Sequence, residues 1–229
     1  MISIVIPSYN QSAYLRECIQ SALDQSVPAH EIVVVDDGST DDSLKIAREY
    51  PVKVISQVNK GLSSARNTGI MNSTGEYILF LDADDKLAFN AVERIEHFID
   101  ETQADIISPS FQTFGTTNQP LILMPEPKLE DFKTGNRIGY CSAVRKADLL
   151  EVGGYSPKMW TGYEDLHLWI NLLTRGKRIF TIPEILWFYR TKEVSMITES
   201  IKHHEELMNQ IFKDFPNFKG ETLNTPLPT

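Results

Sequence analysis

Residues 77–85 read Tyr-Ile-Leu-Phe-Leu-Asp-Ala-Asp-Asp, an apolar run that ends in three carboxylates within four positions. A continuous run of this kind predicts a strand buried on both faces, as a parallel sheet requires. The carboxylates then follow the C-terminal end of the strand, where open α/β sheets bind their ligands. Crowded carboxylates repel one another unless a cation or a shared proton relieves them. We therefore expect a divalent metal, Mn²⁺ or Mg²⁺, at Asp82 and Asp84.

The segments around this stretch alternate between strand-like and helix-like patterns in the first half of the chain. Ser12 is expected to cap the first helix, and Thr40 the second. Such alternation implies right-handed crossovers and a mostly parallel central sheet flanked by helices, which is an α/β fold. Apolar runs predict further strands at residues 2–7, 31–36, 52–58 and 105–109.

The second half of the chain is less regular. Apolar segments on either side of Pro183 predict two separate strands, at 179–182 and 185–189. A helix is expected over 164–175, ended by Gly176, and an amphipathic helix over 200–215. The remaining predictions are a strand at 139–144 and a disordered tail at 220–229, rich in Pro and Thr.

Composition limits the class of protein. The chain has 229 residues, of which 41% are hydrophobic and 23% charged, as in an ordinary globular protein. A net charge of −9 argues against binding nucleic acid through its phosphates, which needs a basic face. The two cysteines, Cys18 and Cys141, have no metal-site or disulfide spacing, so a reducing cytoplasm fits best. The apolar N-terminus is broken at Pro7 and predicts a strand, not a signal peptide.

Asp36 and Asp37 end another buried run, just as Asp82 does. One acidic strand end is more often a solvated turn, since Asp is common there. Two such ends in one parallel sheet favour a ligand instead. One could accept a hydrogen bond from a base or ribose, while the other holds a hard cation on a diphosphate. Neither GxGxxG nor GxxxxGK[ST] is present, so a nucleoside diphosphate would be held without those glycine-rich loops.

Four segments of the first half form an ordered set of motifs: Ser3 to Asn10, Val33 to Asp41, Gly61 to Gly69, and Phe80 to Asp85. The second half adds the motifs Gly-Gly-Tyr, Tyr-Glu-Asp-Leu and Tyr-Arg. In these motifs the chain resembles the family 2 glycosyltransferases, which have the GT-A (nucleotide-diphospho-sugar transferase) fold. The resemblance covers about residues 2–195.

This resemblance implies an inverting transfer of a sugar from a nucleotide sugar, most often a UDP-sugar, to an acceptor hydroxyl. By position, Asp37 would accept a hydrogen bond from the base, Asp84 would bind the metal, and Asp82 would contact the ribose or donor sugar. Lys60 and Arg66 could meet phosphate or be surface charges. The residues that the resemblance places on the nucleotide and donor are Pro7, Tyr9, Asn10, Asp37, Lys60, Arg66, Asp82, Ala83, Asp84 and Arg190.

Asp165 has two interpretations. Acidic residues are common in the first turn of a helix, because their negative charge interacts favourably with the positive end of the helix dipole. This alone could explain Glu164 and Asp165. The family resemblance instead makes Asp165 the catalytic base. Trp160, Tyr163 and Glu164 are candidate acceptor contacts, since aromatic rings can stack on a sugar, although the two aromatic residues could equally pack their own loop.

Several broader expectations follow. Residues 1–219 would form one domain, with a nucleotide-sugar half (1–110), an acceptor half (111–199) and a C-terminal helix (200–219). The partners would be a nucleotide sugar and a saccharide or glycolipid acceptor used in bacterial cell-surface assembly, and not a nucleic acid. The protein would be cytoplasmic. The last helix could dock at the inner face of the membrane, although its mixed Lys and Glu content favours packing on the domain.

Three other classes remain as alternatives. A nucleotidyltransferase also needs carboxylates and a metal, but usually has an early basic loop, which is missing near residues 8–12. A phospho-acceptor signalling module gathers acidic strand ends, but is about half this length. A catalytically inactive nucleotide-sugar-binding or scaffold protein of the same fold would have little need of Asp37, Asp82, Asp84 and Asp165 together.

Overall fold

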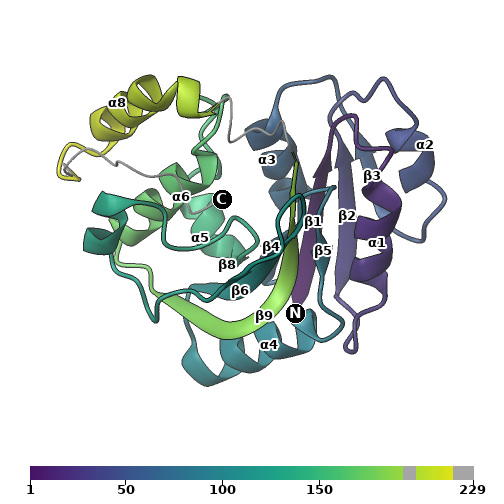
Figure 1. Ribbon diagram of the computed structural model, residues 1–229, viewed down its shortest axis with the longest axis horizontal. Helices are drawn as coiled ribbons and strands as arrows, with labels where there is room; N and C mark the ends of the chain where they lie inside the picture. Colours follow the sequence, from purple (N-terminus) through teal and green to yellow (C-terminus); the bar gives the residue numbers. More distant parts are fainter. Residues whose placement is uncertain (193–199, 219–229) are drawn as a thin grey trace.

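The structure, a computed structural model, describes residues 1–192 and 200–218. One mixed sheet of nine strands organises this part of the chain, in the order β3-β2-β1-β4-β8-β6-β9-β5, with β7 paired to β6 (Figure 1). The expected tail at 220–229 lies outside the described residues.

The first half forms the parallel part of the sheet. β1 (Ile2–Ser8) pairs in parallel with β2 (Glu31–Asp36) on one side and with β4 (Tyr77–Phe80) on the other. β3 (Lys53–Ser56) is shorter than predicted and extends the sheet beyond β2. Every residue of β1 and β4 is buried. This confirms that the apolar run before Asp82 forms a strand that is covered on both faces.

The second half adds antiparallel pairings and one long parallel pairing. β8 (Ala143–Arg145) runs antiparallel between β4 and β6 (Ile106–Gly115), and β9 (Ile179–Thr191) runs parallel to β6. Two short strands, β5 (Lys86–Leu87) and β7 (Pro120–Leu121), pair with β9 and β6 respectively.

The prediction of two strands around Pro183 is wrong. β9 continues through Pro183, because the register with β6 jumps from Ile182 opposite Pro109 to Ile185 opposite Ser110. The proline and Glu184 therefore fall in an irregularity, where the missing N–H of proline interrupts no ladder. One long strand, β9, therefore runs from Ile179 to Thr191, so it contains Arg190 and ends directly before Lys192.

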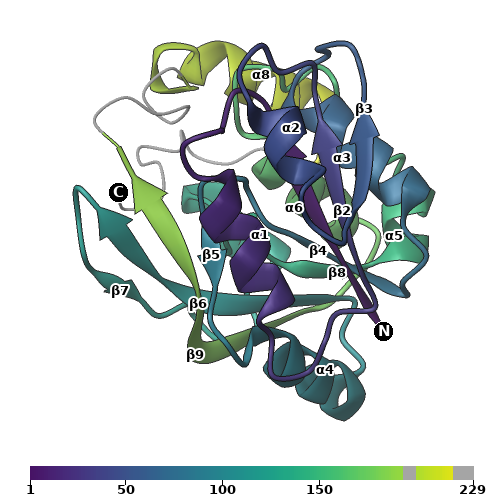
Figure 2. The same ribbon diagram turned by 90° about the vertical axis from the view of Figure 1, so that its right-hand side faces the viewer.

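Helices cover both faces of the sheet. In Figures 1 and 2, α1 (Leu15–Leu23) and α2 (Ser43–Ala47) lie on one face of the parallel strands, and α3 (Leu62–Asn72) lies on the other. The remaining helices are α4 (Ala91–Thr102), the 3-10 helix η1 (Leu129–Thr134), α5 (Lys146–Glu151), α6 (Glu164–Leu173) and α8 (His204–Asp214). None of the helices in the described ranges has both the length and the apolar character to cross a membrane.

Both predicted N-caps are wrong. α1 begins at Leu15, and the Ser12 N–H instead donates to Asp41 Oδ2 at 2.9 Å. α2 begins at Ser43, three residues after Thr40, whose N–H and hydroxyl both reach Asn10 Oδ1. These hydrogen bonds join the loop after β1 to the loop after β2. Polar groups used in this way are not available to cap a helix.

α3 lies very close to β1. A Cβ built on Gly69 would come within 2.2 Å of Val5 Cγ1, so only glycine allows this contact. Arg66, on the same helix, reaches Asp82 just after the end of β4, with its Nη2 2.8 Å from Asp82 Oδ1.

Candidate active site

The two acidic strand ends lie at one edge of the sheet. β1 separates β2 from β4, and all three strands point the same way, so Asp37 and Asp82 flank the end of β1. The Asp37 N–H donates to Ser8 O at 2.8 Å, which extends the pairing of the strands into the loops. The two acidic ends thus belong to one parallel sheet, as expected, although β1 separates the strands that carry them.

Asp37 organises the loop that leads into α3. Its Oδ1 accepts from Gln57 Nε2 at 2.6 Å and from the Lys60 N–H at 3.0 Å, and its Oδ2 accepts from the Gly61 N–H at 2.8 Å. The side chain is buried. This network fixes the carboxylate, and Oδ2 receives one of the three bonds.

The loop after β1 carries two other predicted residues. Asn10 has a left-handed backbone with φ of 52°, and its N–H donates to Ser39 Oγ at 3.1 Å. Tyr9, just before it, is 46% exposed. An exposed ring held on a fixed loop next to Asp37 is suited to stack on a planar ligand.

The three carboxylates after β4 have three different partners. Asp82 Oδ1 accepts from Arg66 Nη2 at 2.8 Å. Asp84 Oδ2 forms an ion pair with Lys192 Nζ at 2.6 Å. Asp85, fully buried, accepts from the Tyr140 hydroxyl and, at 2.6 Å, from the Arg190 N–H.

The same surroundings change the acidity of this cluster. Burial raises the pKa of Asp82 to about 6, against the lowering effect of Arg66. Burial and the neighbouring Asp84 raise the pKa of Asp85 well above its usual range. Ion pairs with Arg66 and Lys192 thus relieve Asp82 and Asp84, and the buried surroundings of Asp85 favour its neutral form.

Arg66 lies at the centre of the site, fully buried. Its Nη2 binds Asp82, and its Nη1 donates to Glu164 Oε1 at 2.7 Å. The guanidinium lies over two rings, 5.2 Å from the centroid of Tyr140 and 5.0 Å from that of Tyr155. Although burial opposes it, the nearby Asp82, Tyr155 and Glu164 hold the pKa of Arg66 well above its ordinary value. This burial excludes the surface-charge interpretation of Arg66.

Asp165 follows Glu164 in the first turn of α6. Its Oδ1 accepts from the Leu166 N–H at 2.7 Å and its Oδ2 from Asn136 Nδ2 at 2.8 Å. Burial, followed by the charge of Glu164, raises the pKa of Asp165 to about 7, against the effects of Arg66 and of these two hydrogen bonds. A carboxylate with this pKa can accept a proton near neutral pH.

The entry to α6 is strained. Tyr163 has φ of 57°, a left-handed conformation that is uncommon for an aromatic residue. Its hydroxyl lies 2.8 Å from His204 Nδ1, so α8 holds it. Trp160 is 72% exposed, and its ring centroid is 6.3 Å from that of His203. Of the three predicted acceptor residues, only Glu164 is buried in an ion pair, with Arg66.

The carboxylates of Asp82 and Asp84 fit a hard divalent cation that takes only one or two of its ligands from the protein. Asp82 and Asp84 offer carboxylate oxygens and keep 25% and 23% side-chain exposure. Within residues 1–192 and 200–218, no three His, Cys, Asp or Glu side chains gather as a metal site. A metal here would therefore take one or two carboxylates and complete its shell with phosphate and water oxygens, as Mg²⁺ commonly does.

Cations gather beside these carboxylates. The Arg190 Nε donates to Asp84 O at 2.7 Å, and its Nη2 forms an ion pair with Glu17. The guanidinium lies 4.5 Å from the ring centroid of Tyr14 and 4.2 Å from that of Phe114. Sequence reasoning placed Arg190 here but missed Glu17, because their contact joins α1 to the end of β9.

Asn136 and Tyr140 were also missed. They lie in or after a segment rich in Pro and charge, with no periodicity to mark them. Only the packing of this segment against β4 and α6 brings them to Asp85 and Asp165.

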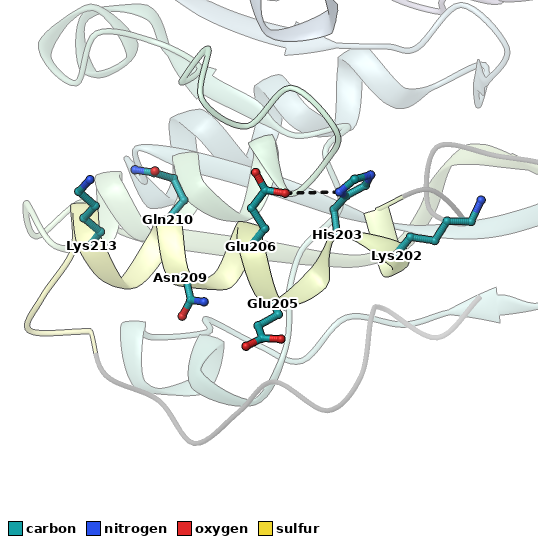
Figure 3. A pocket seen from close by; sticks show the side chains of 7 residues that line it. All are labelled: Lys202, His203, Glu205, Glu206, Asn209, Gln210 and Lys213. Atoms are coloured by element: carbon teal, nitrogen blue, oxygen red, sulfur yellow. Dashed lines mark ion pairs between the residues drawn. The ribbon is translucent and has the colours of Figure 1, made fainter.

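A separate hollow lies on α8. Figure 3 shows its lining side chains along the helix, with an ion pair between His203 and Glu206. None of the predicted site residues lines it. The lining residues are Lys202, His203, Glu205, Glu206, Asn209, Gln210 and Lys213.

Comparison with known proteins identifies the family. The model of glycosyl transferase family 2 matches residues 3–166, and the chain belongs to this family. It is 30% identical over 199 residues to the putative teichuronic acid biosynthesis glycosyltransferase TuaG of Bacillus subtilis, covering 83% of this chain and 79% of that protein. It is 42% identical over 119 residues to the glycosyltransferase GlyA of Streptococcus pneumoniae, half of this chain. The chain spans only 17% of GlyA and 34% of EpsJ from B. subtilis.

Solved structures confirm the fold as GT-A. S. aureus TarS 1-349 in complex with UDP-GlcNAc superposes with a TM-score of 0.81 at 23% identity, covering 96% of this chain and 68% of that one. The mannosyltransferase PcManGT from Pyrobaculum calidifontis, in complex with GDP-Man and Mn²⁺, gives 0.73 at 19% identity, covering 96% and 65%.

Proposed function

We propose that the chain transfers a sugar, with inversion, from a nucleoside-diphosphate sugar to an acceptor hydroxyl. The observation that carries the proposal is the buried Arg66, which binds Asp82 through one nitrogen and Glu164 through another. It connects the strand end that would receive the donor to the helix start that carries Asp165. Donor and base are thereby held in one frame, as transfer between two bound substrates requires.

The donor lies along the edge formed by β1, β2 and β4. Pro7, Tyr9 and Asn10 line the base pocket, and Asp37 Oδ2 accepts a hydrogen bond from the base. Lys60 and Arg190 face the diphosphate with their charges, and Asp82 contacts the ribose or donor sugar. A divalent cation, Mn²⁺ or Mg²⁺, held by Asp84 with Asp82, would stabilise the charge that develops on the departing diphosphate.

Asp165 acts as the base. Its carboxylate accepts the proton of the acceptor hydroxyl as that oxygen attacks the anomeric carbon, the bond to the diphosphate breaks, and the nucleoside diphosphate leaves. The Leu166 N–H and Asn136 hold the carboxylate in place. Trp160 and Tyr163 line the acceptor side, next to α8.

A UDP-sugar is the donor that we favour, because TarS, a structural neighbour, binds UDP-GlcNAc. A saccharide or glycolipid of bacterial cell-surface polysaccharide assembly is the favoured acceptor, since relatives are named for teichuronic acid and poly(ribitol-phosphate). Residues 1–110 would then serve the donor and 111–199 the acceptor. We place the reaction in the cytoplasm, where nucleotide sugars are made.

A donor panel tests the proposal. The protein is incubated with UDP-, GDP- and dTDP-sugars, with and without Mn²⁺ and candidate acceptors, and release of the nucleoside diphosphate is measured. Turnover of one donor class that depends on Asp165 supports the proposal. Nucleotide binding without turnover of any donor, unchanged in Asp165→Asn, would favour an inactive nucleotide-sugar-binding protein.

A further inference from the structure

Lys192 forms an ion pair with Asp84, the carboxylate that is proposed above to bind the metal. Its Nζ lies 2.6 Å from Asp84 Oδ2 and 4.4 Å from the ring centroid of Tyr14. Asp82 is already bound to Arg66, and Asp85 to Tyr140 and the Arg190 N–H. The charged partner that the described part of the chain gives Asp84 is thus Lys192.

The backbone beside Lys192 is held firmly. Thr191 Oγ1 donates to Phe114 O at 3.1 Å, accepts from the Thr117 N–H at 2.9 Å, and lies 3.0 Å from Thr117 Oγ1. Gly115 packs so closely on Thr191 that an added Cβ would lie 2.5 Å from its carbonyl oxygen. The root of the Lys192 side chain is therefore fixed next to Asp84.

The side chain itself can leave. Lys192 is 26% exposed, and an ammonium on a four-carbon stem reorients readily. Arg190 differs, because its guanidinium is held between Tyr14 and Phe114 and bonded to Asp84 O and Glu17. Of these two cations, only Lys192 can exchange one anionic partner for another at low cost.

We propose that Lys192 is an internal counter-ion of Asp84 that a divalent cation must displace, and that the displaced ammonium then binds the donor diphosphate. This inference rests on the proposed function. Metal alone has to compete with Lys192 for Asp84, whereas metal and nucleotide together provide the ammonium with a new anionic partner. The two ligands therefore bind cooperatively, each raising the affinity for the other by the same factor.

Mn²⁺ binding tests the proposal without any reaction. Free Mn²⁺ is measured by electron paramagnetic resonance as it is titrated into the full chain, first alone and then with UDP. A partly exposed ion pair contributes up to about 1 kcal/mol, so Lys192→Met should bind Mn²⁺ alone about fivefold more tightly than the wild type. Lys192→Arg, which keeps the charge, should bind like the wild type.

Lys86→Met is the matched control. Lys86 is 33% exposed and pairs with Glu17 at 2.8 Å, so the variant loses the same charge nearby without touching Asp84. Its Mn²⁺ affinity should rise less than that of Lys192→Met. With UDP present, Lys192→Met should lose its advantage, because it lacks the diphosphate contact.

Two results would overturn the proposal: unchanged or weaker Mn²⁺ binding by Lys192→Met, or an equal gain in Lys86→Met. Asp84→Asn separates this failure from failure of the proposed metal site. If Asp84→Asn binds Mn²⁺ with UDP as well as the wild type does, the metal site itself is wrong.

Discussion

Arg66 Nη1 lies 2.7 Å from Glu164 Oε1, although the two residues are 98 positions apart in the chain. Arg66 is fully buried and Glu164 nearly so. Through Arg66, which also pairs with Asp82, the start of α6 that carries Asp165 is held to α3 and to the end of β4. The buried cation therefore positions the proposed base together with the Leu166 N–H and Asn136.

Removing that cation should destabilise the fold strongly. Arg66→Met leaves Glu164 and Asp82 without their cation, and breaking a buried pair costs about 3–5 kcal/mol. Urea denaturation should show this loss. In Arg16→Met, the matched control, an exposed pair with Glu49 is broken, and no measurable change is expected. Equal stability of the two variants would contradict the central role of Arg66.

The transfer rate should depend on pH through Asp165. Only the deprotonated carboxylate can accept the acceptor proton, and its pKa is raised to about 7. The value of kcat/KM for the acceptor should therefore fall about tenfold per pH unit below about 7 and level off above it. UDP affinity, measured by calorimetry over the same range, provides the control for binding. A rate that stays level down to pH 5 would exclude Asp165 as the base.

The same carboxylate should destabilise the folded protein. Its pKa is raised from 3.8 to about 7, so the folded state binds more protons than the unfolded state between these values. Stability from this group is therefore lost as pH rises through that window. Asp165→Asn should exceed the wild type by about 1–3 kcal/mol at pH 8, and by less at pH 5.

Asp41→Asn provides the opposite case for comparison. Although burial acts to raise the pKa of Asp41, hydrogen bonds from Ser43 and Ser12 lower it to about 2. Asp41 therefore stabilises the folded state above pH 3.8, and this stabilisation is lost as pH falls through about 2. Asp41→Asn should thus be less stable than the wild type at pH 7. Parallel pH dependence of the two variants would contradict both assignments.

Trp160 should affect the acceptor and little else. It is 72% exposed, so Trp160→Ala should leave the melting temperature unchanged. Loss of stacking on a sugar ring should raise KM for the acceptor about two- to tenfold, with UDP affinity unchanged. Phe89→Ala, equally exposed at 70% in the segment between β5 and α4, should change none of these values. An unaltered acceptor KM in Trp160→Ala would mean that the ring only covers its loop.

Local pattern was sufficient to predict the parallel half of the fold. The buried runs ending at Asp36 and at Leu81 predicted strands, and parallel strands bring their acidic ends to one edge. Gly176 was correctly expected to follow α6, and it has φ of 77°. These features depend on residues adjacent in sequence.

The rest depended on distant partners. β9 continues through Pro183 because its register with β6 shifts at that point, and the residues next to Pro183 give no sign of this shift. Likewise, Lys192 lies 2.6 Å from Asp84 because the end of β9 pairs with β5, the short strand that begins two residues after Asp84. Such contacts follow from the order of the strands in the assembled sheet and not from the local sequence.

The most direct measurement compares Asp165→Asn with the wild type. UDP affinity with Mn²⁺ is determined by calorimetry, and sugar transfer by nucleoside diphosphate release with the best donor and acceptor. In Asp165→Asn we expect UDP affinity within about twofold of the wild type and transfer reduced by a factor of about 10² to 10⁴. Transfer at the wild-type rate, or loss of UDP binding together with transfer, would contradict the assignment of Asp165 as the base.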